Sequence, residues 1–474
     1  MPILIYNSLS RKKEEFKPLQ PRQIKMYVCG PTVYDQPHIG HARSAYIFDV
    51  IRRYLIYKYR DYKFTFVRNV TDVDDKIIQK AKEEYKGEDL NSAVQKVAKK
   101  YLDAYHEDMR QLGILDPDVE PKATEYIPAM QKFIQELIKR DAAYVSGGDV
   151  YFDIRKAKDY GKLSHQAIEK MEAGARVAAG EKKKDPLDFA LWKSAKENEP
   201  SWDSPWGKGR PGWHIECSVM SSDILGDEFD IHGGGLDLIF PHHENEIAQS
   251  EGAGKKFARY WIHHGLLTIN GQKMSKSLGN FITVKGFIER YKYPDLLKLL
   301  FLSTHYLHPV DYTEEKIKEA KEALERISIL WGKINGTAER KVANNIPDEL
   351  EAVKNKFVAA MDDDFNTPQG LAAIFELVNI TNKNLSNKDF VSVSREMLME
   401  LTKLFGLGLS VTVTPEPLAL QSGLHDEIKI LIKQREEARK VKDFKKSDSI
   451  RKELEEQGII LEDTKEGTAW RRKL

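Results

Sequence analysis

The sequence predicts an α/β fold: a Rossmann-like parallel sheet that an insertion interrupts, then a helical bundle and a small C-terminal domain. Three observations indicate this. Strand and helix patterns alternate near the N-terminus, the alternation stops near residue 126 and resumes near Trp213, and helical periodicity with few prolines and glycines follows Asp311. A chain of 474 residues is too long for one hydrophobic core, so we expect about two to four domains.

The N-terminal part contains a strand, a helix and a second strand. Residues 24–29 are β-prone and end at a sharp glycine-proline turn. Ile47, Ile51 and Leu55 recur at helical spacing, and residues 64–67 form the next β-prone run. Strand, helix and strand at this spacing predict a parallel, right-handed βαβ unit, which is typical of nucleotide-binding domains.

The pattern changes over residues 126–203, which predict an insertion into the first domain. Within it, Gly147 and Gly148 precede a β-prone run and predict a hairpin turn. Further on, Thr313 followed by two glutamates predicts the capped start of a long helix. A last unit with an apolar helical face begins at Asp426.

The composition bounds the class of protein. Hydrophobic residues make up 41% of the chain, enough for packed cores, and no apolar run approaches the length of a membrane span. The formal charge of 74 − 73 = +1 does not by itself indicate a nucleic-acid partner. The chain has only two cysteines, Cys29 and Cys217. Composition alone leaves two inert thiols and a metal site equally open.

The first motif with a chemical interpretation is His38-Ile39-Gly40-His41, at the predicted start of a helix. A helix N-terminus offers unpaired N–H groups to phosphate, and imidazoles can donate further hydrogen bonds. Gly40 leaves room for a purine to lie against the backbone. The alternative is a helix cap without a ligand.

The second motif is Lys273-Met274-Ser275-Lys276-Ser277, followed by a leucine and a glycine. Two lysines beside small hydroxyl residues suit a loop that neutralises charge on a departing pyrophosphate. The alternative interpretation is an ordinary solvated basic turn.

The third set contains the two cysteines. His242 and Glu246 are four residues apart, so on a helix they share a face. Two thiolates, an imidazole and a carboxylate form a plausible zinc set with Cys29 and Cys217. Without the cysteines, His242 and Glu246 would be interpreted as an ordinary helix-face pair.

The paired histidine and lysine motifs resemble the signatures of class I aminoacyl-tRNA synthetases. Further stretches resemble the cysteinyl-tRNA synthetase family within that class, so the resemblance covers nearly the whole chain. These stretches are residues 29–35, 68–72, 185–193, 209–217, 462–464 and 470–472.

The resemblance implies specific roles for these residues. A zinc ion that binds the thiolate of substrate L-cysteine is expected on Cys29, Cys217, His242 and Glu246. The amino acid is expected among Thr71, Trp213 and His232. The two histidines are expected to bind the triphosphate of ATP, Asp237 its ribose, and the two lysines the charge of the transition state, with Mg²⁺ accompanying the nucleotide. The residues expected to contact ATP are His38, His41, Gly40, Asp237, Met274, Lys273 and Lys276.

The resemblance also implies a domain order. The expected parts are a catalytic domain in two halves (1–125 and 204–257), a connective insertion (126–203), a stem-contact region with the lysine loop (258–316), a helical bundle (317–418) and an anticodon-binding domain (419–474). The insertion is short for a proofreading domain. We therefore expect discrimination against serine to occur at the metal, because a soft thiolate binds zinc far better than a hydroxyl does.

The expected reaction is ligation of cysteine to tRNA(Cys) through a cysteinyl-adenylate. One alternative is a ligase that joins cysteine to an amino-sugar by the same adenylate, and another is a non-catalytic RNA-binding relative. Residues 429–452 hold ten Lys or Arg against four Asp or Glu, and Trp470-Arg471-Arg472 lies close behind. A basic helix with flat side chains nearby favours RNA, although a solvated helix face would have the same composition.

The intact motifs argue against the non-catalytic relative. The N-terminus lacks a secretory signal, and we expect a cytoplasmic enzyme that is a monomer and does not contact membranes.

Overall fold

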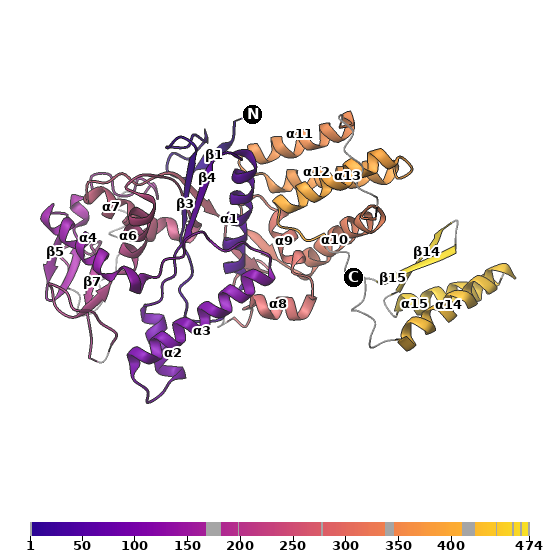
Figure 1. Cartoon of the computed structure of the whole chain (residues 1–474). Helices are drawn as coiled ribbons and strands as arrows, with labels where there is room; N and C mark the ends of the chain where they lie inside the picture. The colour runs from indigo at the N-terminus through magenta and orange to yellow at the C-terminus, as the bar shows by residue number, and fades with distance from the viewer. Residues whose placement is uncertain are drawn as a thin grey trace.

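The computed structural model describes residues 2–472 apart from 167–181, 198, 276–277, 337–345, 410–421, 442, 457–458 and 465–466. Along the chain, an α/β part comes first, a helical bundle follows and a small α/β unit comes last (Figure 1). A short N-terminal hairpin, β1 (Leu4–Asn7) and β2 (Lys12–Glu15), precedes the central sheet and contacts its edge strand β10.

The central sheet is four-stranded and parallel, in the order β10-β9-β3-β4. Its strands are β3 (Gln23–Val28), β4 (Lys63–Arg68), β9 (Phe229–Gly235) and β10 (Ala258–His264). The predicted parallel sheet and its first βαβ unit are therefore confirmed. The centre of the sheet joins distant parts of the chain, since β3 pairs with β9 through Met26 and Ile231. Every residue of β9 is buried, as expected for a strand covered on both faces.

Helix α1 (Ile39–Lys58) connects β3 to β4 and packs against the bundle. Between β4 and the insertion lie two helices that the sequence pattern did not predict, α2 (Asp75–Glu84) and α3 (Leu90–Gln111). The second half of the sheet carries α6 (Trp213–Leu225) and α7 (Glu244–Gly252), with the short turns η3 (Leu236–Leu238) and η4 (Ile239–His243) after β9.

The inserted segment forms its own antiparallel sheet, in the order β5-β6-β7-β8. The elements are η1 (Ala123–Tyr126), α4 (Ile127–Lys139), β5 (Ala143–Ser146), β6 (Asp149–Phe152), η2 (Ile154–Lys156), β7 (Phe189–Ser194) and β8 (Gly209–Pro211). Gly147 and Gly148 have φ angles of 63° and 92° and connect Ser146 to its partner Asp149. The predicted hairpin turn is confirmed, because a two-residue turn with both φ angles positive favours glycine.

A short three-stranded sheet follows the central sheet, and its strand β12 (Gln272–Lys273) contains the first residue of the lysine motif, Lys273. The other two strands are β11 (Leu267–Ile269) and β13 (Val310–Tyr312). Two helices, α8 (Val284–Tyr291) and α9 (Asp295–Leu302), lie between β12 and β13.

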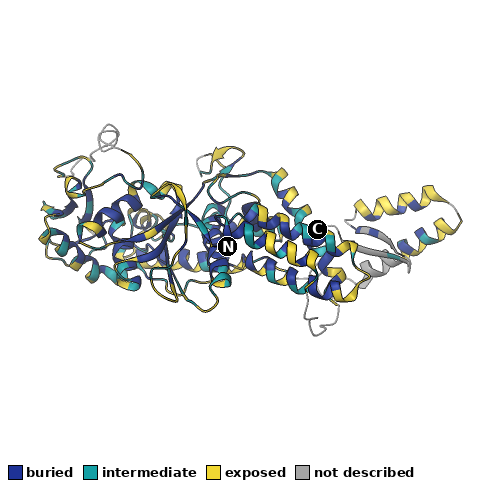
Figure 2. Cartoon of the chain, turned by 90° about the horizontal axis from the view of Figure 1, so that it is seen from above, coloured by how far each residue is buried: buried dark blue, intermediate teal, exposed yellow. Residues whose placement is uncertain are grey.

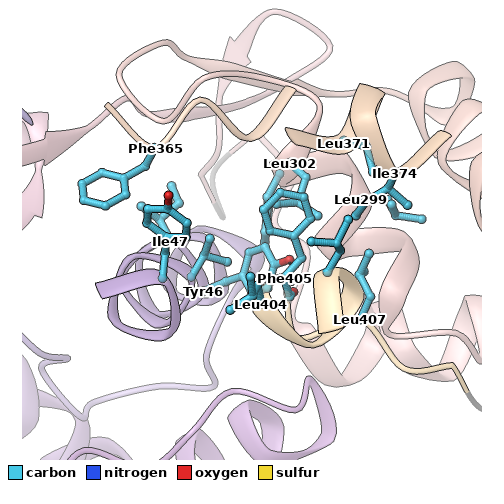
Figure 3. Packing of buried hydrophobic residues seen from close by; sticks show 14 of the residues in the cluster. Tyr46, Ile47, Leu299, Leu302, Phe365, Leu371, Ile374, Leu404, Phe405 and Leu407 are labelled. Carbon is cyan, nitrogen blue, oxygen red and sulfur yellow. Dashed lines mark hydrogen bonds between the residues drawn. The ribbon is translucent and has the colours of Figure 1, made fainter. Parts of the chain in front are cut away.

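The bundle follows with α10 (Glu314–Ile334), α11 (Asp348–Asp362), α12 (Thr367–Lys383) and α13 (Lys388–Leu404). Thr313 accepts a hydrogen bond from Lys316 N, so the predicted cap of α10 is confirmed. One hydrophobic core extends from α1 into the bundle, where Tyr46 of α1 lies near Leu299, Leu302 and Phe405 (Figure 3). This shared core fixes the helix that carries the histidine motif to the bundle.

The C-terminal unit consists of α14 (Ser422–Lys440), α15 (Phe444–Glu456), β14 (Ile459–Thr464) and β15 (Gly467–Arg472). It has its own small core of Ile432, Ile450, Leu454, Ile459 and Leu461. Exposed residues cover most of its helices (Figure 2). In the described part of the chain, no helix is long and apolar enough to cross a membrane.

Candidate active site

The candidate site lies at the carboxyl edge of the central sheet, where ligands bind in open α/β folds. A cavity of about 530 Å³ lies at this edge. Its lining includes predicted residues from both halves of the sheet: Cys29, His38, Gly40, His41, Asp237, Lys273 and Met274. A larger cavity of about 650 Å³ lies among α1, α3, α9, α10 and α13, and none of the predicted site residues lines it.

The four predicted metal ligands come together beside this cavity. Cys29 follows β3, Cys217 lies in α6, His242 lies in η4 and Glu246 lies in the first turn of α7. Their potential ligand atoms all lie within 4.8 Å of one another. The Sγ atoms of Cys29 and Cys217 are 3.6 Å apart, Cys29 Sγ lies 3.7 Å from Glu246 Oε1, and His242 Nε2 lies 3.0 Å from the same oxygen.

These distances can be compared with a zinc site. Zinc–sulfur bonds of about 2.3 Å at a tetrahedral angle place two sulfurs about 3.8 Å apart, and a sulfur and an oxygen about 3.6 Å apart. The observed separations of 3.6 and 3.7 Å are close to both values. The 3.0 Å between His242 Nε2 and Glu246 Oε1 is shorter than the roughly 3.4 Å that a tetrahedral ion would set, so an ion would require a small shift of these two side chains.

A second possible ligand set overlaps the first, with His232 and His243 in place of Cys217 and His242. The two carboxylate oxygens of Glu246 contact different histidines. His232 Nε2 lies 2.7 Å from Oε2, whereas His242 lies against Oε1, the oxygen that faces Cys29. His243 Nε2 lies 3.2 Å from Cys29 Sγ, and its Nδ1 lies 2.8 Å from His263, whose other nitrogen lies 2.8 Å from Ser8 Oγ.

Burial controls the ionisation of this cluster. Burial raises the pKa of the Cys29 and Cys217 thiols and of the Glu246 carboxyl, and it lowers the pKa of His242. These groups therefore favour their neutral forms when no ion is bound. A divalent cation would reverse this preference, because it stabilises thiolate and carboxylate directly.

The residues predicted to surround the amino acid lie against the metal cluster and not in the lining of the cavity. Thr71 donates a hydrogen bond to Glu216, the neighbour of Cys217, at 2.6 Å. The Trp213 ring stacks on His242 with 4.1 Å between centroids, and it is 41% exposed. The structure thus brings Thr71, Trp213 and His232 to one end of the site.

The histidine motif caps α1. His38 Nδ1 accepts hydrogen bonds from the backbone N–H groups of Gly40 (3.1 Å) and His41 (3.3 Å), and His41 Nδ1 accepts from His38 N at 3.3 Å. Because both Nδ1 atoms accept, a neutral ring must carry its hydrogen on Nε2. Burial lowers the pKa of His41 to about 3, so this ring is neutral at pH 7. The two imidazole rings stack 3.7 Å apart and offer Nε2–H donors suited to phosphate.

Gly40 lies at a point of close approach. A Cβ atom there would lie 2.9 Å from the His38 ring and 3.5 Å from Met274 Cε. Across the cavity, a Cβ on Gly235 would lie 2.3 Å from Asp237 Oδ1. These glycines keep open the space in which the nucleotide is expected.

Of the two lysines, Lys273 lies exposed on β12 and lines the cavity, while Lys276 lies outside the described residues. Asn280 closes the loop: its Oδ1 accepts from Ser275 N at 2.8 Å and its Nδ2 donates to Lys273 O at 3.2 Å. For Trp470, Arg471 and Arg472, the structure describes the backbone, in β15, and not the side chains.

Arg43 is a buried residue of the site that the sequence pattern did not indicate. It is 1% exposed, lines the cavity and donates to the carbonyl oxygens of Leu266, Tyr306 (3.4 Å) and His308 (2.5 Å). Leu266 immediately precedes β11, and His308 lies two residues before β13. Arg43 therefore connects the helix of the histidine motif to the sheet of the lysine motif. No sequence signal distinguishes it from a surface arginine of α1.

Asn69 was also missed as a site residue. Its Oδ1 accepts from Gly30 N at 2.9 Å and lies 3.7 Å from Cys217 Sγ. It therefore fixes the turn that carries Cys29 and contacts the second cysteine. Its signals in the sequence were its position shortly after a predicted strand and within the stretch 68–72 that resembles the family.

Comparison with known families assigns the whole length of the chain. Residues 15–322 match the model for the catalytic domain of tRNA synthetases class I (C), residues 356–410 match the DALR domain, and residues 421–471 match the anticodon binding domain of cysteinyl-tRNA ligase. The cysteine–tRNA ligase of Geobacillus thermodenitrificans is 50% identical over 99% of this chain and 99% of its own. That of Anoxybacillus flavithermus is 50% identical over 100% of both chains.

Solved structures support the fold. Mycobacterium tuberculosis methionyl-tRNA synthetase with methionyl-adenylate matches with a TM-score of 0.57 at 16% identity, over 81% of this chain and 90% of its own. The LeuRS of Agrobacterium radiobacter in a ternary complex with tRNA matches with a TM-score of 0.59 at 12% identity, over 82% and 85%. At these identities the likeness concerns the fold alone, and it confirms the predicted fold class.

Proposed function

Since the chain belongs to the cysteine–tRNA ligase family of class I synthetases, we propose that the carboxyl edge of its central sheet binds both small substrates, with cysteine at the metal cluster and ATP in the adjoining cavity. The enzyme performs an ATP-dependent ligation of cysteine to tRNA. The observation that carries the proposal is the pair of thiols of Cys29 and Cys217, 3.6 Å apart, with Glu246 beside them.

The reaction has two steps. The carboxylate of cysteine attacks the α-phosphate of ATP, which releases pyrophosphate and leaves a cysteinyl-adenylate. A hydroxyl of the terminal ribose of tRNA then attacks the carbonyl carbon and releases AMP. The enzyme forms no covalent intermediate, so positioning and charge stabilisation supply the acceleration.

The cluster of cysteine, histidine and glutamate side chains, where the substrate cysteine is proposed to bind, could hold one zinc ion. We assign Cys29, Cys217, His242 and the Oε1 atom of Glu246 as its ligands, because this set contains two soft thiolates and the separations from Cys29 Sγ to Cys217 Sγ and to Glu246 Oε1 are near the tetrahedral values. His232 then holds the other oxygen of Glu246. Zinc at this position would supply a soft Lewis acid that prefers the thiolate of cysteine to the hydroxyl of serine.

The remaining residues act on substrate orientation and charge. Thr71 and Trp213 border the amino acid, and Gly40 and Met274 border the adenine. The Nε2–H groups of His38 and His41 donate to the triphosphate, with Asp237 at the ribose. Lys273 and Lys276 neutralise the pyrophosphate as it leaves, with Mg²⁺ accompanying ATP.

The C-terminal unit supports tRNA ligation over amino-sugar ligation. Residues 421–471 match an anticodon-binding domain, which a ligase acting on an amino-sugar would not need. We propose that Trp470, Arg471 and Arg472 contact tRNA(Cys). We also propose that the domains follow the order given above, with β8 in the insertion and β10 in the catalytic domain because of the sheets they join, and that the enzyme is a cytoplasmic monomer.

The test is ATP–pyrophosphate exchange with each standard amino acid, before and after treatment with a zinc chelator. Cysteine alone should support rapid exchange, the chelator should abolish it, and added zinc should restore it. Elemental analysis should give about one zinc per chain. Full cysteine activation by protein that contains no zinc would refute the metal assignment. Exchange with serine as fast as with cysteine would refute the specificity mechanism.

A further inference from the structure

His264 is a residue of the cavity without an assigned role. It is the last residue of β10, directly opposite Gly235, the last residue of β9. It lines the cavity and is 6% exposed. Its Nδ1 lies 2.9 Å from the carbonyl oxygen of Gly265. Because a carbonyl oxygen only accepts, Nδ1 carries the hydrogen and Nε2 is left as an acceptor.

The Nε2 atom of His264 is buried and has no hydrogen-bond partner among the described residues. Buried acceptors are seldom left unsatisfied, since this costs free energy. Burial also lowers the pKa of His264 to about 4, with a further contribution from Arg43, so the ring is neutral at pH 7. The geometry therefore provides a neutral acceptor that requires a donor from outside the protein.

The carboxylate of Asp237 and the ring of His264 both lie close to Gly235. A Cβ atom on Gly235 would lie 2.3 Å from Asp237 Oδ1 and 3.6 Å from His264 Cε1, the ring atom bonded to Nε2. The missing side chain of Gly235 thus leaves a space between a carboxylate and an imidazole acceptor. A ligand in this space that donates one hydrogen to each of the two acceptors would satisfy both. The vicinal hydroxyls of a ribose meet this requirement.

We propose that His264 and Asp237 form the ribose subsite of the ATP cavity, each accepting a hydrogen bond from one of the two ribose hydroxyls. This inference rests on the assignment of the cavity to ATP made above. It makes His264 a residue that distinguishes ribonucleotides from deoxyribonucleotides.

A competing arrangement involves Arg43, whose Nε is also buried without a partner and which also lines the cavity. An internal water that bridges Arg43 Nε and His264 Nε2 would satisfy both atoms. His264 would then have a structural role, and its loss would affect all nucleotides equally. The nucleotide series below separates the two arrangements.

The experiment measures kcat/KM for cysteine-dependent pyrophosphate exchange with ATP, 2′-deoxyATP and 3′-deoxyATP. The variants are His264→Phe, which removes the acceptor, and His264→Asn, which retains a carbonyl acceptor. His264→Phe should lose about 10- to 100-fold with ATP, the range for an unsatisfied polar contact. It should lose little with the deoxynucleotide that lacks the hydroxyl bound by His264. His264→Asn should recover part of the loss, and the KM for cysteine should not change.

Several outcomes would overturn the proposal. Equal losses of His264→Phe on all three nucleotides would favour the structural water. A wild-type enzyme that uses both deoxynucleotides as well as ATP would exclude a ribose subsite, even if the phenylalanine variant failed to fold. Gly40→Ala, which crowds the nucleotide space, serves as the control. If Gly40→Ala leaves the KM for ATP unchanged, the assignment of the cavity to ATP fails. If Gly40→Ala raises that KM but His264→Phe shows no selectivity, only the His264 proposal fails.

Discussion

At the residue scale, the two oxygens of Glu246 organise the amino-acid end of the site. Oε1 faces Cys29 and His242, while Oε2 lies 2.7 Å from His232. A single carboxylate would therefore bind the proposed metal through one oxygen, while its other oxygen contacts His232. Losing its charge should affect both functions, whereas losing a nearby carboxylate on the same helix should affect neither.

We expect Glu246→Gln to weaken zinc binding by about 10- to 100-fold, the range for altered metal sites, and to raise the KM for cysteine. Zinc content after dialysis against a graded chelator series measures the effect. Glu244→Gln is the matched control, because Glu244 is buried on the same helix but accepts from Leu163 N and Ser164 N instead. Equal zinc retention by the two variants would contradict the ligand assignment.

The lysine motif gives a second prediction at this scale. We expect Lys273→Ala and Lys276→Ala each to lower the rate of adenylation by about 100- to 1,000-fold, the effect of removing a group that stabilises transition-state charge. The KM for cysteine should change little, because these contacts strengthen only as charge develops. Single-turnover formation of the adenylate measures the rate. Lys285→Ala, on the exposed face of α8, is the control. An unchanged rate with an altered KM for cysteine would exclude the proposed role.

At the scale of elements, helix α1 combines two tasks. Its N-terminus holds the stacked rings of His38 and His41, and its inner face packs into the core shared with the bundle (Figure 3). Arg43, only two residues after His41, donates hydrogen bonds to backbone carbonyl oxygens just before β11 and β13. The distance between the two ATP motifs is thereby set by one helix and one arginine.

The buried ring of His41 predicts a pH dependence of stability. Its pKa is about 3 in the folded protein and about 6.5 in the unfolded chain. Between these values only the unfolded chain binds the proton, so folding becomes less favourable as the pH falls below 6.5. The contribution of this one group is about 1.4 kcal/mol per pH unit.

The comparison of wild type with His41→Asn isolates this term, because the titration of other groups cancels in the difference. Urea denaturation at several pH values gives the free energy of unfolding of both proteins. The wild-type value minus the variant value should rise by about 1.4 kcal/mol per unit from pH 4 to 5.5, rise more slowly through pH 6.5 and become level by about pH 7.5. A difference that does not depend on pH would show that the ring has the same pKa in the folded and unfolded states, so that burial does not lower it.

Local patterns account for what the sequence could predict at this scale. The strand, turn and helix around Cys29, the hairpin turn at Gly147 and the cap at Thr313 all depend on neighbouring residues, and each is present. The pairing of β3 with β9 depends on segments about 200 residues apart, which periodicity cannot connect. Sequence periodicity likewise could not predict the contacts from His243 through His263 to Ser8, because these residues are far apart in the chain.

At the scale of the whole molecule, the adenylation site and the anticodon-binding unit are separate bodies of structure. The predicted adenylation residues that the structure describes all lie between Cys29 and Met274, whereas the C-terminal unit has its own core from Ile432 to Leu461. Cys29, Cys217, His242 and Glu246 lie close together, a long-range arrangement that the family resemblance implied and that periodicity could not predict. Their roles remain proposals.

Truncation after residue 418 tests this separation. Exchange of pyrophosphate with cysteine should remain nearly intact, while charging of tRNA should fall steeply because the basic helices are lost. The salt dependence of tRNA binding should also become shallower, by about 0.7–0.9 in slope for each phosphate contact removed. Filter binding at several salt concentrations measures it.

Anticodon substitutions in the tRNA provide the control for the truncation. They should weaken the full-length enzyme and matter little to the truncated one. Charging by the truncated protein at the full-length rate would show that the C-terminal unit does not read the anticodon.

The order of strands in the central sheet also governs how the chain is made. β9 lies between β3 and β10, so the inner edge of β3 has no partner until about 200 further residues have left the ribosome. At about 5–20 residues per second, this takes roughly 10 to 40 s. Over that interval the nascent chain presents an unpaired strand edge, the kind of surface on which chains aggregate. Glu246 is the last residue of the proposed metal set to be synthesised, so the set can be completed only after β9, which precedes it, has also been made.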